Sequence, residues 1–146
     1  MKYLSLFIAP VIILSLCLSA LAQGGAPDPR DVERDVEAAF RSALSMVAYH
    51  ECWKLWEGAT QQSRIAISKD EACKIFNQAT SRVAVGGIED LKVTSTSAAT
   101  AVIAARLTVE SKNSPRPLVL RRSFVFFFED GGWRFHLWDY LSLVSY

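Results

Sequence analysis

The chain has 146 residues, a formal net charge of +1 and three cysteines. The length predicts one domain. The near balance of 16 basic and 15 acidic residues argues against a nucleic-acid binder that works through a broad basic surface. With 51% hydrophobic and 21% charged residues, most of the chain is predicted to fold rather than to stay disordered.

Residues 1–22 have the three parts of a secretory signal peptide. Lys2 gives a positive start, residues 4–18 are almost wholly apolar, and Ala20-Leu21-Ala22 forms a small-residue cleavage site. Cleavage is therefore predicted before Gln23, and the protein is expected to be exported to the periplasm or the cell exterior. Removing these 22 residues leaves 124, with 15 basic and 15 acidic residues.

Two other interpretations of this segment remain open. It can stay uncleaved as a membrane anchor, although Pro10 interrupts the apolar run, or Cys17 can carry a lipid, although the bulky Leu16 precedes it. No later stretch approaches the roughly 20 apolar residues that a membrane-spanning helix needs. No stable membrane insertion is expected once the signal is removed.

Export favours a disulfide between the two remaining cysteines, Cys52 and Cys73, because disulfides persist in oxidising compartments. The alternative is a pair of buried free thiols on neighbouring helices. There is no C-x-x-C motif, and His50 and His136 lie far apart in sequence, so neither a metal site nor a cofactor is predicted.

The first half of the mature chain is predicted to be helical. Residues 23–27 form a Gly/Pro-containing linker, and Asp28 followed by Pro29 is a typical helix start. Helical spacing then predicts one long amphipathic helix, whose buried stripe is Val32, Val36, Phe40, Ala43 and Val47.

Two shorter helices are predicted next. The first covers residues 49–57 and stops at Gly58, a residue that tolerates the left-handed conformation. Residues 59–67 are ambiguous. Ser68 and Glu71 then form a capping box that opens the second helix, whose apolar stripe is Ala72, Ile75, Phe76 and Ala79.

After Arg82 the hydrophobic period changes to two. Gly86-Gly87 is expected to break the chain, and alternating residues from Ile88 onward predict four antiparallel strands, with a possible short fifth at 83–85. The last strand is predicted over 133–140, after a hairpin turn at Asp130-Gly131-Gly132. The fold class is therefore α+β, with the helices gathered on one face of the sheet.

With a two-residue turn, the residue numbers of each cross-strand pair in this last hairpin add up to an odd number. One face is then almost wholly apolar, apart from Arg122 and Asp139 near its far end. It carries Leu118, Leu120, Phe124, Phe126, Phe128, Trp133, Phe135 and Leu137. The opposite face is mixed, and Arg121, Arg134, Trp138 and Tyr140 on it are candidates for a partner or homodimer surface.

The order of these elements, with the segments YHECWKLW at 49–56 and EDGGWRF at 129–135, resembles the NTF2-like superfamily, and in particular its small exported bacterial members. The resemblance covers about residues 28–140 and implies a curved antiparallel sheet wrapped around helices as a cone with an internal pocket. We accordingly treat residues 28–146 as one NTF2-like domain. The superfamily includes ketosteroid isomerases, polyketide cyclases and dehydratases, as well as members without known activity, so the fold does not fix the function.

The strongest catalytic candidate is Asp139, because a carboxylate beside an apolar wall has a raised pKa and can act as a base. Tyr49 and His50 are the candidates to assist it. The competing interpretation pairs Asp139 structurally with Arg122, which shares its face.

A second set of residues is a candidate lining for a ligand cavity, and its alternative role is simply to fill the cone. The set is Trp53, Trp56, Arg122, Phe124, Phe126 and Phe135.

The sequence therefore predicts an exported, non-enzymatic domain that binds a small apolar molecule or an envelope protein. The alternative is an enzyme of the isomerase, cyclase or dehydratase kind that uses a pocket carboxylate as its base.

Overall fold

The computed structural model describes residues 29–97 and 99–145. The signal segment, the linker at 23–27 and the Asp28 helix cap lie outside the described residues. The helices are α1 (Pro29–Ala48), α2 (Cys52–Gly58), α3 (Gln61–Ala66), α4 (Lys69–Thr80), α5 (Leu137–Leu141) and the 3₁₀ turn η1 (Ser142–Val144). The strands are β1 (Val83–Thr96), β2 (Thr100–Ser111), β3 (Leu118–Glu129) and β4 (Gly132–Phe135).

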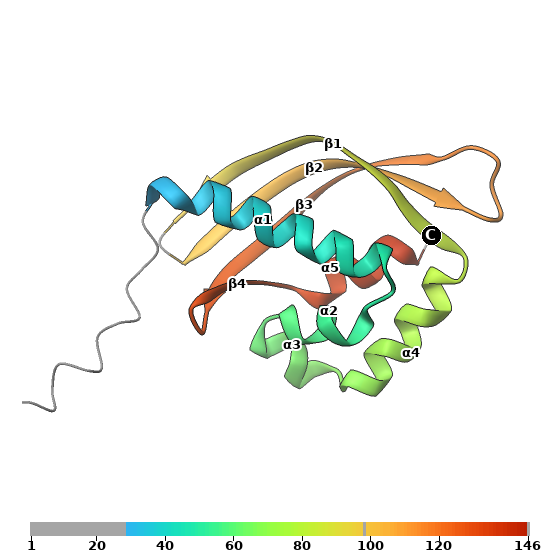
Figure 1. The fold of residues 1–146 in the computed structure, drawn as a ribbon, viewed down its shortest axis with the longest axis horizontal. Coiled ribbons are helices and arrows are strands. Elements are labelled where there is room, and N and C mark those ends of the chain that lie inside the picture. Colours follow the sequence, from blue (N-terminus) through green and yellow to red (C-terminus); the bar gives the residue numbers. More distant parts are fainter. Residues whose placement is uncertain (1–28, 98, 146) are drawn as a thin grey trace, which may run out of the picture.

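The four strands form one antiparallel sheet in the order β1-β2-β3-β4. The sheet curves, and all the helices lie on its concave side (Figure 1). The alternation along β2 shows why: its odd-numbered residues from Ala101 to Val109 are buried against the helices, and the even-numbered ones are half-buried or exposed on the outer face. The predicted α+β class and the helices on one face are confirmed.

Several local predictions are confirmed. The whole predicted stripe of α1, from Val32 to Val47, is buried. The Ser68 Oγ accepts a hydrogen bond from the Glu71 backbone N–H at 3.2 Å and begins α4. In the ambiguous stretch, the Thr60 side chain accepts from the Ser63 N–H and begins α3.

The predicted helix over 49–57 is wrong at its start. The α1 helix continues to Ala48, and the chain then turns at His50, whose φ is +57°. Helix α2 begins only at Cys52, because a residue in the left-handed region cannot continue a right-handed helix. The expected end at Gly58 is correct to one residue, but the helix terminates by extension of Ala59 (φ −75°, ψ 162°) and not through a left-handed glycine.

Gly86-Gly87 does not break the chain, and residues 83–85 are not a separate strand. Both lie within β1, whose pairing with β2 shifts register between Val85 and Gly87, between Glu89 and Lys92, and between Val93 and Ser95. A Cβ on Gly86 would lie 2.8 Å from the Glu110 Oε1, so the first shift lets the strand pass close to that side chain. The bulges allow one 14-residue strand to follow the curvature of the sheet.

The last hairpin has the predicted two-residue turn, with Asp130 at φ +51° and Gly131 at φ +76°. Its pairs run from Glu129–Gly132 to Phe126–Phe135, so partner numbers sum to an odd value as expected. The predicted strand to Tyr140 is wrong, because β4 ends at Phe135 and the chain turns into α5.

This turn changes the position of two residues. Asp139 lies on α5 and does not oppose Arg122 in the sheet. Tyr140 is fully buried, and is not on the outer face. Leu137, Tyr140 and Leu141 follow the i, i+3, i+4 spacing of a helix and not the alternation of a strand, and the helix lets all three reach the core.

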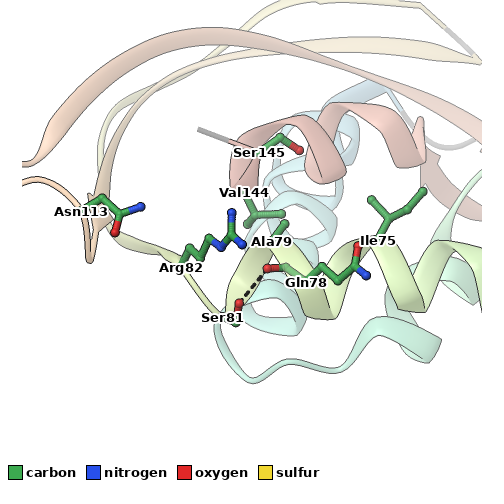
Figure 2. A pocket seen from close by; sticks show the side chains of 8 residues that line it. All are labelled: Ile75, Gln78, Ala79, Ser81, Arg82, Asn113, Val144 and Ser145. Carbon is green, nitrogen blue, oxygen red and sulfur yellow. Dashed lines mark hydrogen bonds between the residues drawn. The ribbon is translucent and has the colours of Figure 1, made fainter.

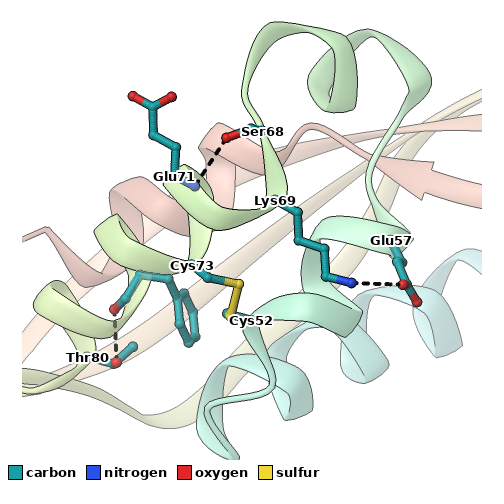
Figure 3. Close-up of a disulfide and its surroundings, with 8 residues drawn as sticks. Cys52, Glu57, Ser68, Lys69, Glu71, Cys73 and Thr80 are labelled. Carbon is teal, nitrogen blue, oxygen red and sulfur yellow. Dashed lines mark hydrogen bonds and ion pairs between the residues drawn. A yellow bond between two sulfur atoms is a disulfide. The ribbon is translucent and has the colours of Figure 1, made fainter.

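The disulfide between Cys52 and Cys73 is confirmed. It joins the first residue of α2 to the second turn of α4, with the two Cα atoms 5.3 Å apart (Figure 3). The Lys69–Glu57 ion pair links the same two helices at 3.6 Å. Within the described part of the chain, no helix combines the length and apolarity needed to cross a membrane.

Candidate functional site

The interior of the curved sheet is filled by aromatic side chains. The Phe40 ring of α1 lies 4.9 Å from Phe124, and Tyr140 lies 5.3 Å from Phe124 and 4.5 Å from Phe135. Phe126 packs edge-on against Phe135 at 6.2 Å. All five side chains are buried. Three predicted ligand-lining residues, Phe124, Phe126 and Phe135, are therefore placed in the packed core.

The two predicted tryptophans lie away from this cluster. Trp56 is half-buried, and its Nε1 donates to the Ile67 carbonyl at 3.0 Å. Trp53 is 47% exposed and lies between two ammonium groups, 5.4 Å from Lys54 and 5.9 Å from Lys69. The helical segment α2 thus presents one tryptophan inward and the other to the surface.

Asp139 is half-buried in the first turn of α5. Burial raises the pKa of its carboxyl group above the ordinary value, and the charges of His136 and Arg122 and a hydrogen bond from the Val125 backbone offset part of this rise. The Arg122 Nη1 donates to the Ser142 Oγ at 3.1 Å, so Arg122 contacts the turn that follows α5. The predicted proximity of Asp139 and Arg122 therefore holds electrostatically, although their predicted strand pairing does not.

Tyr49 and His50 occupy the exposed turn between α1 and α2. Tyr49 is 75% exposed, and the His50 ring packs edge-on against Phe76 of α4 at 6.4 Å. The pKa of Asp139, in contrast, is affected by His136, which precedes α5, and by Arg122 and Val125 of β3. The described contacts place these candidate catalytic residues in two different environments.

A cleft of about 710 Å³ lies where the end of α4 meets the loop between β2 and β3 and the turn η1 (Figure 2). Its apolar part is Ile75, Ala79 and the fully buried Val144. Its polar part is Gln78, Ser81, Arg82, Asn113 and Ser145. Figure 2 shows the side chains of Arg82 and Asn113 directed into the space between these elements. The volume is in the range of ligand sites.

The residues that line this cleft suit the binding of a ligand. Arg82 is the one ionisable residue among the eight that line it. Its guanidinium has no ion pair or side-chain hydrogen bond among the described residues. The Ser81 Oγ is already engaged, since it donates to the Gln78 carbonyl at 2.7 Å.

This cleft was not predicted from the sequence. Arg82 stands at the point where the hydrophobic period changes from helix to strand, and the cleft also needs Asn113 and Val144, 31 and 62 residues further along the chain. A polar residue at such a junction is the only local signal, and it does not identify its distant partners.

No family model matches the chain, and no curated protein sequence matches it. Solved structures do match. A protein from Xanthomonas campestris, named after the calcium/calmodulin dependent protein kinase II association domain, has a TM-score of 0.54 at 20% identity, covering 76% of this chain and 88% of its own. A second, from Novosphingobium aromaticivorans and named for an aromatic ring hydroxylase, has a TM-score of 0.53 at 13% identity, covering 75% and 87%.

At these identities the likeness concerns the fold. Helices followed by a curved, four-stranded antiparallel sheet give this chain the architecture of an NTF2-like cone.

Proposed function

We propose that the protein is an exported, non-enzymatic domain that binds a small ligand in the cleft between α4, the β2–β3 loop and η1. The observation that carries this proposal is the lining of the cleft, where the Arg82 guanidinium, which has no partner among the described residues, lies beside apolar side chains. Aromatic side chains occupy the interior of the cone, and this packing supports a ligand site in the cleft rather than inside the sheet.

The ligand class follows from the lining. Ile75, Ala79 and Val144 suit a short hydrocarbon group, and Arg82 suits a carboxylate, which a guanidinium can bind through two parallel N–H donors. The side-chain amides of Gln78 and Asn113 add further donors. The proposed ligand is therefore an amphipathic organic acid.

The enzyme alternative has less support. A proton abstraction needs a base within hydrogen-bond reach of the substrate. Asp139 has a raised pKa, but it is not among the residues that line this cleft. The eight lining residues include neither a carboxylate nor a histidine.

The test is an NMR titration of ¹⁵N-labelled protein with octanoate, and with 1-octanol as the neutral analogue. We expect octanoate to shift the amides of Ile75, Ala79 and Val144. Arg82→Gln should weaken octanoate binding about tenfold or more, because a hydrogen bond to a charged group contributes about 1.5–3 kcal/mol. The matched control is Arg116→Gln, which removes an exposed arginine that does not line the cleft.

Equal binding by the Arg82 and Arg116 variants would contradict the proposal. So would octanoate-induced shifts centred on Phe124 and Phe126, because these would locate the ligand inside the cone.

A further inference from the structure

The outer face of the sheet carries a second candidate site, distinct from the cleft. Two adjacent rows of side chains cross the strands there. One row is Lys92, Ala104 and Ser123, and the next is Glu89, Arg106 and Arg121. Because Ala104 and Ser123 are small, they leave a hollow of about 370 Å³ beside the two arginines. We call these six residues, together with Asp90, which also lines the hollow, the arginine patch.

The arginine patch contains a like-charge pair. Arg106 and Arg121 are directly opposite each other in the β2–β3 register. Directly opposed like charges destabilise a sheet. Glu89 and Asp90 lie beside Arg106 and offset this repulsion, so Arg121 is the arginine whose charge an external anion can bind.

The carboxylates of the patch compensate only one of these arginines. The Arg106 Nη2 lies 2.6 Å from the Glu89 Oε2 and 3.3 Å from the Asp90 Oδ2. Asp90 reaches this position from a β1 bulge, with φ at +51°, a conformation uncommon for residues other than glycine. Arg121 and Lys92 are exposed, and neither has an ion pair or side-chain hydrogen bond among the described residues.

One further polar atom is left without a partner. The Nε of Arg106 is buried and has no hydrogen bond within the described residues. Buried donors are normally satisfied, and an unsatisfied one marks a place where an acceptor is missing. Glu89 and Asp90 therefore satisfy the Arg106 guanidinium only in part.

The surroundings of the patch are those of an interface. Val119, near the start of β3, is 55% exposed and shares the outer face with Arg121. Exposed apolar residues beside arginines are typical of protein contact surfaces. A second copy of this chain docked symmetrically here would bring its own Arg121 toward this one, so the charge favours an acidic partner.

We infer that the arginine patch is a docking surface for an extended acidic segment of a partner protein, whose Glu or Asp side chains bind Arg121 and Lys92 while an apolar neighbour contacts Val119. This inference concerns a different face from the cleft and does not depend on the ligand proposed for it.

The probe for the test is a fluorescein-labelled peptide of alternating Glu and Val residues, and its Gln–Val analogue serves as the neutral control. Binding is measured by fluorescence anisotropy with the mature protein. Arg121→Gln and Lys92→Gln should each weaken binding about fivefold, the effect of one surface ion pair of about 1 kcal/mol. Arg116→Gln and Lys74→Gln are the matched controls, at exposed positions outside the patch, and should leave binding unchanged.

Thermal unfolding separates docking from a structural role. Arg121→Gln changes an exposed side chain that has no ion pair among the described residues, so it should alter Tm by less than about 3 °C while it weakens peptide binding. A Tm lowered by more than that would assign Arg121 to the fold and would overturn the inference. Absence of peptide binding, equal losses in all four variants, or binding to phosphatidylglycerol vesicles in place of the peptide would overturn it as well.

The cleft and the arginine patch can be tested independently. Arg82→Gln should leave peptide binding intact, and Arg121→Gln should leave octanoate binding intact.

Discussion

At the scale of single residues, Asp139 shows how burial sets a charge state. The net effect of its surroundings is a raised pKa, so the folded protein holds this proton more strongly than the unfolded chain does. Stability is therefore lost as the pH rises from the unfolded pKa through the folded one, because the ionised carboxylate is less well accommodated in the fold.

Asp139→Asn should remove this pH dependence. The amide has nearly the same shape and carries no charge, so we expect the variant to be more stable than the wild type at pH 7 and to lose that advantage below the ordinary carboxyl pKa. Urea unfolding at pH 7 and pH 3.5 measures the difference. A less stable variant at pH 7 would show that the charges of Arg122 and His136 outweigh burial.

Phe124 tests whether the aromatic cluster fills the cone. Phe124→Ala should lower the free energy of unfolding by about 3–5 kcal/mol, because the fully buried ring contacts Phe40 and Tyr140. The vacated space is apolar, and benzene should bind there and restore part of the lost Tm. The wild type is the control, and an equal rise of Tm with benzene in both proteins would mean that a cavity already exists.

At the scale of elements, the disulfide joins α2 to α4. Replacing both cysteines, Cys52→Ala with Cys73→Ala, opens a loop with a sequence separation of 21. In the chain-entropy model the loss is about 3 kcal/mol. Denaturant unfolding of the oxidised wild type, the reduced wild type and the double variant measures it, and the last two should unfold alike.

Some of the elements were predictable from the sequence and one was not. The stripe of α1, the capping residue Ser68 and the turn at Asp130-Gly131 were predictable because each depends on neighbours a few residues away. The end of β4 was not. Trp133, Phe135 and Leu137 continue the alternation of a strand, whereas Leu137, Tyr140 and Leu141 have helical spacing, so the two patterns overlap at Leu137 and the strand was predicted too long.

The candidate site was less predictable than the fold for a related reason. Phe124 and Phe126 were correctly assigned to the inner face, but a pattern of apolar residues is the same for a filled core and for a cavity lining. The cleft around Arg82 combines a helix end, a loop and a C-terminal turn, so its composition exists only in the folded chain.

At the scale of the whole molecule, export is a prediction that rests on the first 22 residues. When the full chain is expressed in a bacterium, we expect it outside the cytoplasm with Gln23 as its first residue. Intact-mass measurement of the protein recovered from periplasm and medium gives both the start and the state of the cysteines. A mass that retains Met1 would contradict cleavage, and a lipid adduct on Cys17 would identify the lipoprotein alternative.

The edges of the sheet bear on how the molecule behaves at high concentration. At β4 the Thr60 N–H donates to the Phe135 carbonyl at 2.9 Å, so the α2–α3 connection covers the end of that edge. At the other edge, three register shifts interrupt β1. A strand from a second molecule cannot pair continuously with an edge whose backbone is repeatedly bent out of line. The bulges that let β1 follow the curve of the sheet therefore also protect the protein against fibril growth.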